Sequence, residues 1–143
     1  MKEEAVLSLS AYEPMTEQAA SLLNMLQLAY LGDSVWEVLV RNELLRQGKN
    51  VHHMHNSCIE LVNAHAQAVF AEQILPELED KEREILRRGR NAHTRHPVPR
   101  NQHPEDYSAS TGFEALIGYL YLTGKEERLL QLSRMMIGGN ANG

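Results

Sequence analysis

Two carboxylates that lie far apart in the chain, Asp33 and Glu114, are the side chains best suited to chemistry. Asp33 interrupts the stretch Leu22–Leu45, in which apolar residues recur every three or four positions, as on one face of a helix. An ionised carboxylate on such a face loses hydration unless a cation compensates its charge. The sequence therefore predicts an arginine, a lysine or a metal ion opposite Asp33. The predicted face contains Leu22, Leu26, Ala29, Asp33, Trp36 and Val40.

Glu114 lies at the edge of the apolar face of a second predicted helix, which Phe113, Leu116, Ile117 and Leu120 form. Periodicity alone favours a solvent-exposed glutamate there. Two carboxylates without cationic partners of their own nevertheless indicate a hard divalent cation, Mg²⁺ with several water ligands. Beside a phosphate-binding segment, such an ion would support hydrolysis of a phosphodiester bond.

A strongly basic segment, residues 83–103, precedes Glu114. It carries six arginines and one acid, a charge of +5, which leaves −10 for the remainder of a chain whose formal net charge is −5. Arginines on a proline-punctuated loop suit the phosphate backbone of RNA or DNA, so we expect nucleic-acid contact here. A solubilising insertion is the alternative. The arginines are Arg83, Arg87, Arg88, Arg90, Arg95 and Arg100.

The elements that must position these residues are predicted to be helices of a single all-α domain, residues 16–137, without internal repeats. Gly32, directly before Asp33, fits a kink or the close approach of another backbone or a ligand. Residues 1–15 are expected to form a lead-in segment and residues 138–143 a frayed tail. Helices are expected at 16–47, 50–70, 77–90, 108–123 and 126–136, with Gly48 and Gly124 as stops and residues 93–107 as the basic loop.

Composition favours a cytoplasmic protein. The single cysteine, Cys58, allows no internal disulfide and suits a reducing compartment. The first four residues lack the pattern of a secretory signal, and no apolar run reaches membrane-spanning length, so no membrane partner is expected.

Histidines offer a different metal site. His52, His55 and His65 lie on the predicted helix 50–70 at spacings that would permit zinc ligation. The favoured interpretation is surface histidines at a polar helix start, because no second cysteine or nearby carboxylate completes a ligand set.

Two motifs resemble those of the ribonuclease III family. The segment Leu28–Val35, LAYLGDSV, looks like the family signature, and Phe113–Gly118, FEALIG, looks like its second acidic motif. The match is closest to the Mini-III subgroup, which has a catalytic domain and no double-stranded-RNA-binding domain. The run Arg88–Ala92 and the following loop also resemble this subgroup, so the similarity extends from about Leu22 to Leu132.

The resemblance implies a dimeric helical bundle and a Mg²⁺-dependent endonuclease that cuts double-stranded RNA to 5′-phosphate and 3′-hydroxyl ends. The implied substrate is precursor 23S rRNA in the bacterial cytoplasm, so the protein would act in rRNA processing and ribosome biogenesis, with a ribosomal protein on the RNA as a further partner. Asp33 and Glu114 match the family's metal ligands. Tyr30 matches an aromatic position at the dimer interface, to which we also assign Trp36.

The chain departs from the pattern of larger family members at three positions. Leu26, Ala29 and Thr111 stand where those proteins carry acids, which argues against a complete two-metal site. One metal ion would be held firmly and a second recruited with RNA phosphates. Glu37 is expected to pair with Arg41 rather than join the site. A non-catalytic, dimeric RNA-binding or scaffolding protein, with Asp33 paired to an arginine, is the alternative function.

Overall fold

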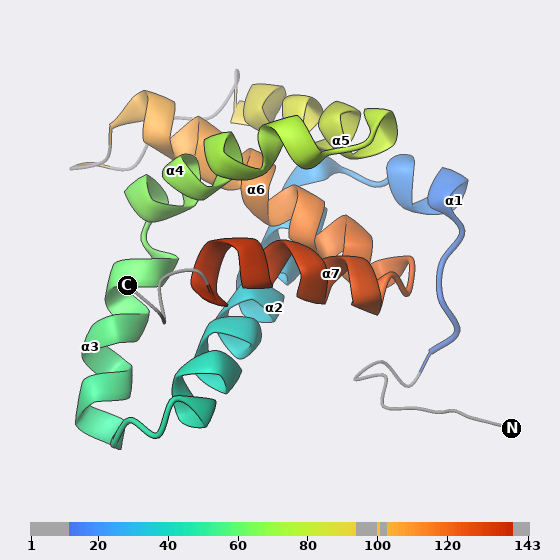
Figure 1. Ribbon diagram of the computed structural model, residues 1–143. Coiled ribbons are helices and arrows are strands. Elements are labelled where there is room, and N and C mark those ends of the chain that lie inside the picture. Colours follow the sequence, from blue (N-terminus) through green and yellow to red (C-terminus); the bar gives the residue numbers. More distant parts are fainter. Residues whose placement is uncertain (1–11, 94–99, 101–102, 139–143) are drawn as a thin grey trace, which may run out of the picture.

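The computed structural model describes residues 12–93, 100 and 103–138, and these ranges contain helices and no strand. The predicted all-α fold is therefore confirmed (Figure 1). Short 3₁₀ or π turns follow three of the helices, at Leu75–Glu77, Asn91–His93 and Arg134–Gly138. The α-helices of the described ranges are α1 (Glu17–Ser21), α2 (Met25–Arg46), α3 (Val51–Val62), α4 (Ala64–Ile74), α5 (Asp80–Arg90), α6 (Pro104–Leu122) and α7 (Glu126–Ser133).

Helix α6 forms the centre of the fold and packs against α2, α4 and α5 (Figure 1). Every residue from Ala109 to Leu120 is buried except Glu114. A helix that is apolar on nearly all sides requires such surroundings. Trp36 of α2 meets Phe113 of α6 and Phe70 of α4 edge to face, with ring centroids 4.9 Å and 5.7 Å away. This aromatic cluster fixes α2 and α4 on α6.

The backbones of α2 and α6 touch at Gly32 and Gly118. A Cβ atom at position 32 would lie 2.7 Å from the carbonyl carbon of Glu114, and one at position 118 would lie 3.2 Å from the amide nitrogen of Gly32. Glycine permits this approach because it has no Cβ. The expectation that Gly32 serves close backbone approach is confirmed. Because Asp33 follows Gly32, the same contact brings Asp33 to the Glu114 segment.

Helix α2 begins later than predicted, as the observed helix caps show. Thr16 caps α1, but the predicted continuous helix breaks before Asn24. The Asn24 side chain accepts a hydrogen bond of 2.7 Å from the backbone of Leu26 and begins α2. α2 continues through Gly32 as one helix, so the chain does not break there. Leu22 is 78% exposed and lies outside α2, so its placement on the Asp33 face is also wrong.

The helix predicted over residues 50–70 is two helices. The Asn63 side chain accepts a hydrogen bond of 2.8 Å from the backbone of Ala66, so it ends α3 and caps α4. An asparagine at this position competes with the helical backbone for hydrogen bonds, which makes a new helix start favourable. The side chain of Val69 on α4 is 51% exposed.

Helix α6 begins earlier than predicted, at Pro104. Ser108, where the helix was predicted to begin, lies inside it. The fixed φ of proline suits the first helical turn, where its missing N–H costs nothing. The loop predicted over residues 93–107 therefore ends before Pro104. Residues 94–99 and 101–102 of this loop lie outside the described ranges.

Helix α7 is fastened to α5 by an ion pair between Arg128 and Glu82. Arg128 donates to the Glu82 carboxylate at 2.8 Å from two nitrogens and to the carbonyl oxygen of Glu77 at 2.7 Å. Burial opposes ionisation of Glu82, but the Arg128 hydrogen bonds and a backbone hydrogen bond outweigh it and lower the pKa of this carboxyl. Of the helices described, none is long and apolar enough to cross a membrane.

Candidate active site

The structure brings Asp33 and Glu114 together. Asp33 lies on the exposed side of α2, whereas Glu114 is partly buried on α6. Burial raises the pKa of the Glu114 carboxyl to about 8, with further contributions from a hydrogen bond with Asp33 and from its charge. The preference for an exposed Glu114 that periodicity alone suggested is thus not met. Near neutral pH the Glu114 carboxyl holds a proton, which a cation can replace.

Two further polar residues, Gln67 and Ser110, lie at Glu114, and neither was predicted to belong to the site. Gln67 of α4 is 1% exposed, and its amide opposes the rise in the pKa of Glu114. The Ser110 hydroxyl, one turn before Glu114 on α6, donates a hydrogen bond to Gln67 Oε1. The available signal was a glutamine three residues before Phe70, on the buried face of an otherwise apolar segment.

The chemistry of this group suits a hard cation. Carboxylate and amide oxygens are the ligands that Mg²⁺ prefers, and Mg²⁺ usually keeps several water molecules when it binds to one or two carboxylates. The described residues contain no group of three His, Cys, Asp or Glu side chains placed for metal binding. Asp33 and Glu114 would therefore supply two ligands, and water or substrate oxygens would supply the others.

Two of the three non-acidic positions, Ala29 and Thr111, are buried, and the third, Leu26, is not part of the core. Ala29 and Thr111 are each 5% exposed, and Leu26 is half-buried. The Thr111 hydroxyl donates to the carbonyl oxygen of Tyr107 at 2.9 Å. Glu37 accepts a hydrogen bond of 2.7 Å from Arg41, which confirms their predicted pairing.

The two aromatic residues assigned to a dimer interface differ in position. The Tyr30 side chain is 87% exposed on α2 and is available to a partner. Trp36 is fully buried, and its Nε1 donates to the carbonyl oxygen of Leu61 at 3.0 Å. The assignment of Trp36 to an interface is therefore wrong, because its position on the helical face directs it into the core of its own chain.

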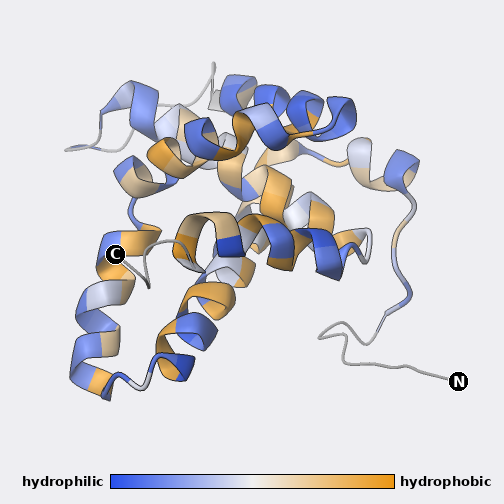
Figure 2. Ribbon diagram, in the orientation of Figure 1, coloured by the Kyte–Doolittle hydropathy of each residue, from blue (hydrophilic) through white to orange (hydrophobic). Residues whose placement is uncertain are grey.

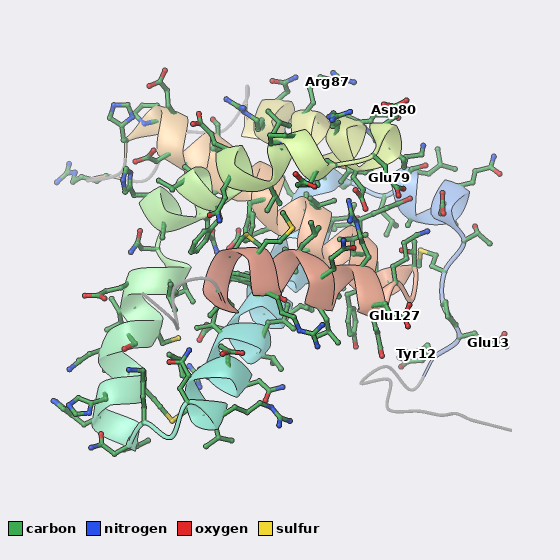
Figure 3. All side chains as sticks on the ribbon, in the orientation of Figure 1. Tyr12, Glu13, Glu79, Asp80, Arg87 and Glu127 are labelled. Carbon is green, nitrogen blue, oxygen red and sulfur yellow. The ribbon has the colours of Figure 1, made fainter. Side chains whose placement is uncertain are left out.

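Most of the predicted RNA-binding arginines gather on α5. Arg83, Arg87 and Arg90 line a shallow pocket of about 290 Å³, and Arg87 and Arg88 line a second one beside the start of α2. Figure 2 shows the outer side of α5 as hydrophilic, and Figure 3 shows the labelled Arg87 and Asp80 projecting from it. Arg83 lies 3.5 Å from Asp80. Arg100 is exposed, and Arg95 lies outside the described ranges.

The histidines do not form the alternative zinc site within the described part of the chain. His52 lies 3.4 Å from the amide of Asn56, and His65 lies 3.0 Å from Asp106. His52, His55 and His65 are exposed, and no group of three potential ligands gathers around them. The surface interpretation of these histidines agrees with their exposure.

Comparison with known proteins adds an independent observation. Residues 26–125 match the ribonuclease III domain. The chain is 46% identical to the Mini-ribonuclease 3 of Symbiobacterium thermophilum over 108 residues, which cover 75% of this chain and 82% of that protein. It is 36% identical to the Mini-ribonuclease 3 of Clostridium tetani over 127 residues, 87% of this chain and 83% of that protein.

A solved structure shares the fold. The crystal structure of a protein from Fusobacterium nucleatum superimposes with a TM-score of 0.74 at 31% identity, covering 83% of this chain and 95% of that one. The segment that matches the family domain contains Asp33, Gln67, Glu114 and the arginines of α5.

Proposed function

Because the chain belongs to the ribonuclease III family and is an endoribonuclease, we propose that it cleaves double-stranded RNA with Mg²⁺ bound by Asp33 and Glu114. The observation that carries the proposal is the contact between these two carboxyls on neighbouring helices, where burial first and then Asp33 raise the pKa of Glu114 to about 8. Such a pair is costly without a cation and becomes a binding site with one.

When bound, Mg²⁺ would activate water and stabilise the oxygen that leaves phosphorus. Glu114 would hold the cation after releasing its proton to solvent. Asp33 is exposed on α2 and would offer its carboxylate from the side that RNA can reach. Ala29 and Thr111 are buried and carry no carboxylate, so they supply no further carboxylate ligand to the metal ion. We infer one firmly held metal ion, with any second ion recruited by the phosphates. The products are 5′-phosphate and 3′-hydroxyl ends.

The arginines of α5 would hold the RNA backbone. Arg87 and Arg90 are exposed and line the pocket on α5. One guanidinium group can donate two parallel hydrogen bonds to the oxygens of one phosphate. The basic loop between α5 and α6 would add Arg95 and Arg100 to these RNA contacts. Because phosphate contacts release counterions, binding should weaken steeply with salt.

The assembly we propose is a homodimer that matures the ends of precursor 23S rRNA in the bacterial cytoplasm, with a ribosomal protein on the RNA as a further partner. The exposed Tyr30 supports an interface on the side of α2 that carries Asp33. The competing idea of a non-catalytic scaffold required an arginine opposite Asp33. In the described part of the chain, the group that interacts with Asp33 is Glu114.

The test is incubation of the protein with a paired stem from a 23S precursor, with and without Mg²⁺, followed by mapping of the RNA ends. We expect defined cuts on both strands of the stem with Mg²⁺ and none with a chelator. A single-stranded RNA of the same composition is the control and should stay intact. Undamaged stem in the presence of Mg²⁺ would contradict the proposal, and equal cutting with a chelator would contradict its metal dependence.

A further inference from the structure

The amide of Gln67 is an unusual buried group. Its side chain is 1% exposed at the junction of α4 and α6. Oε1 accepts a hydrogen bond from Ser110, but Nε2 makes no well-formed hydrogen bond with any described residue. A buried donor without a partner costs about 1–3 kcal/mol, so a fold retains one where another requirement outweighs the cost.

The surroundings of the amide identify that requirement. The Gln67 side chain lies beside the Glu114 carboxyl and interacts with it. The Ser110 hydroxyl holds Oε1, which leaves Nε2 as the donor available to the Glu114 carboxylate. Ser110 and Glu114 are four residues apart on α6 and so share one face of the helix.

We propose that Gln67 is a positioning residue: its amide, oriented by Ser110, holds the Glu114 carboxylate in the orientation that binds the metal ion. This inference rests on the proposed function, because it assigns the support for that same metal site. Hydrogen bonds from neighbouring groups commonly orient metal-binding carboxylates, and their loss costs about tenfold to a hundredfold in metal affinity. Such support is most needed where a site has few ligands of its own.

The alternative explanation is a purely structural glutamine that fills the space between α4 and α6. Replacement by methionine separates the two roles, because methionine keeps the length and flexibility of the side chain but removes the amide. A structural role would change the thermal stability of the metal-free protein and leave metal affinity unchanged. A positioning role would change metal affinity.

The experiment is calorimetric titration of the full chain with Mn²⁺ and with Mg²⁺ in the absence of RNA. We expect Gln67→Met to bind either ion at least about tenfold more weakly than the parent. The matched control is Gln73→Met on the same helix, where the exposed Gln73 donates to the carbonyl oxygen of Met135 at 2.8 Å, and its metal affinity should equal that of the parent. Equal affinity of Gln67→Met and the parent would overturn the inference.

Ser110→Ala provides a second variant that keeps the Gln67 side chain and frees its amide to rotate. We expect several-fold weaker metal binding, and no additional loss when this change is combined with Gln67→Met, because both changes remove the same support. Should Gln67→Met fail to fold, unchanged metal affinity in Ser110→Ala would overturn the inference. A parent protein that binds no metal would overturn the proposed function itself, so the two failures are distinguishable.

Discussion

Asp33 and Glu114 interact across the point where the backbones of α2 and α6 touch, and Glu114 is left with a pKa of about 8. The two glycines at this contact, Gly32 and Gly118, make the approach possible. The carboxyl pair is therefore a consequence of helix packing. The contact between α2 and α6 places two carboxyl groups side by side, and a cation would compensate their charges.

The raised pKa of Glu114 predicts how stability depends on pH in the absence of metal. Its folded-state pKa of about 8 lies above the ordinary value of 4.5, so between these pH values the folded state binds the additional proton. The free energy of unfolding should then decrease by up to about 1.4 kcal/mol for each pH unit as pH rises through this window. Urea denaturation between pH 5 and 8 measures the slope.

The comparison for this measurement is Glu114→Gln, which carries no titratable group at that position. Its stability should fall less steeply than that of the parent over the same pH range. Identical slopes for the two proteins would show that Glu114 titrates normally and that the carboxyl pair is not formed.

Gly32→Ala should destabilise the protein by about 1–3 kcal/mol, because the added methyl group would push α6 away at the Glu114 backbone. Chemical denaturation gives the change in the free energy of unfolding. Ser34→Ala is the control on the same helix, since Ser34 is exposed, and it should change stability by less than about 0.5 kcal/mol. Equal stability of the two variants would mean that α2 and α6 do not touch at Gly32.

Arg128→Met should cost about 3–5 kcal/mol, because it leaves the Glu82 carboxylate buried without its cation. The comparison is Arg41→Met, which breaks the exposed pair with Glu37 and should cost less than about 1 kcal/mol. Thermal or chemical unfolding measures both. A loss in Arg128→Met no larger than in Arg41→Met would rule out a structural role for the ion pair that fastens α7 to α5.

Arg87→Ala and Arg90→Ala should each weaken binding of paired RNA and reduce the slope of log affinity against log salt concentration by about one. Binding is measured at several salt concentrations with a chelator present, so that the RNA stays intact. Arg46→Ala is the control on α2, where the exposed Arg46 donates to Asn42 at 2.9 Å. An unchanged salt slope in both α5 variants would place the RNA elsewhere.

Much of the fold followed from the periodicity of apolar residues. The helical class, the stops at Gly48 and Gly124 and the close approach at Gly32 were all predicted, because each depends on local rules of backbone conformation. The breaks at Asn24 and Asn63 were missed. An asparagine inside an apolar period reads as an ordinary surface residue, and only the capping hydrogen bond distinguishes it.

The candidate site was predicted in part. Asp33 and Glu114 stood out because a carboxylate in or beside an apolar face requires an explanation. Trp36 was assigned to an interface because periodicity shows which residues share a face and does not show which partner covers it. Gln67 stood out only as a glutamine on an otherwise apolar face, which does not tell what it contacts. Only the packing of α4 on α6 brings Gln67 and Ser110 to Glu114.

The most direct test of the central claim compares cleavage of paired RNA by the parent, Asp33→Asn and Glu37→Gln with Mg²⁺ present. Both changes remove one carboxylate from α2, but Glu37 pairs with Arg41 and lies outside the proposed metal site. We predict parent-like cleavage by Glu37→Gln and a loss of at least about a thousandfold, or about 4 kcal/mol in the activation barrier, in a folded Asp33→Asn protein. Cleavage by Asp33→Asn at the rate of the parent would contradict the account.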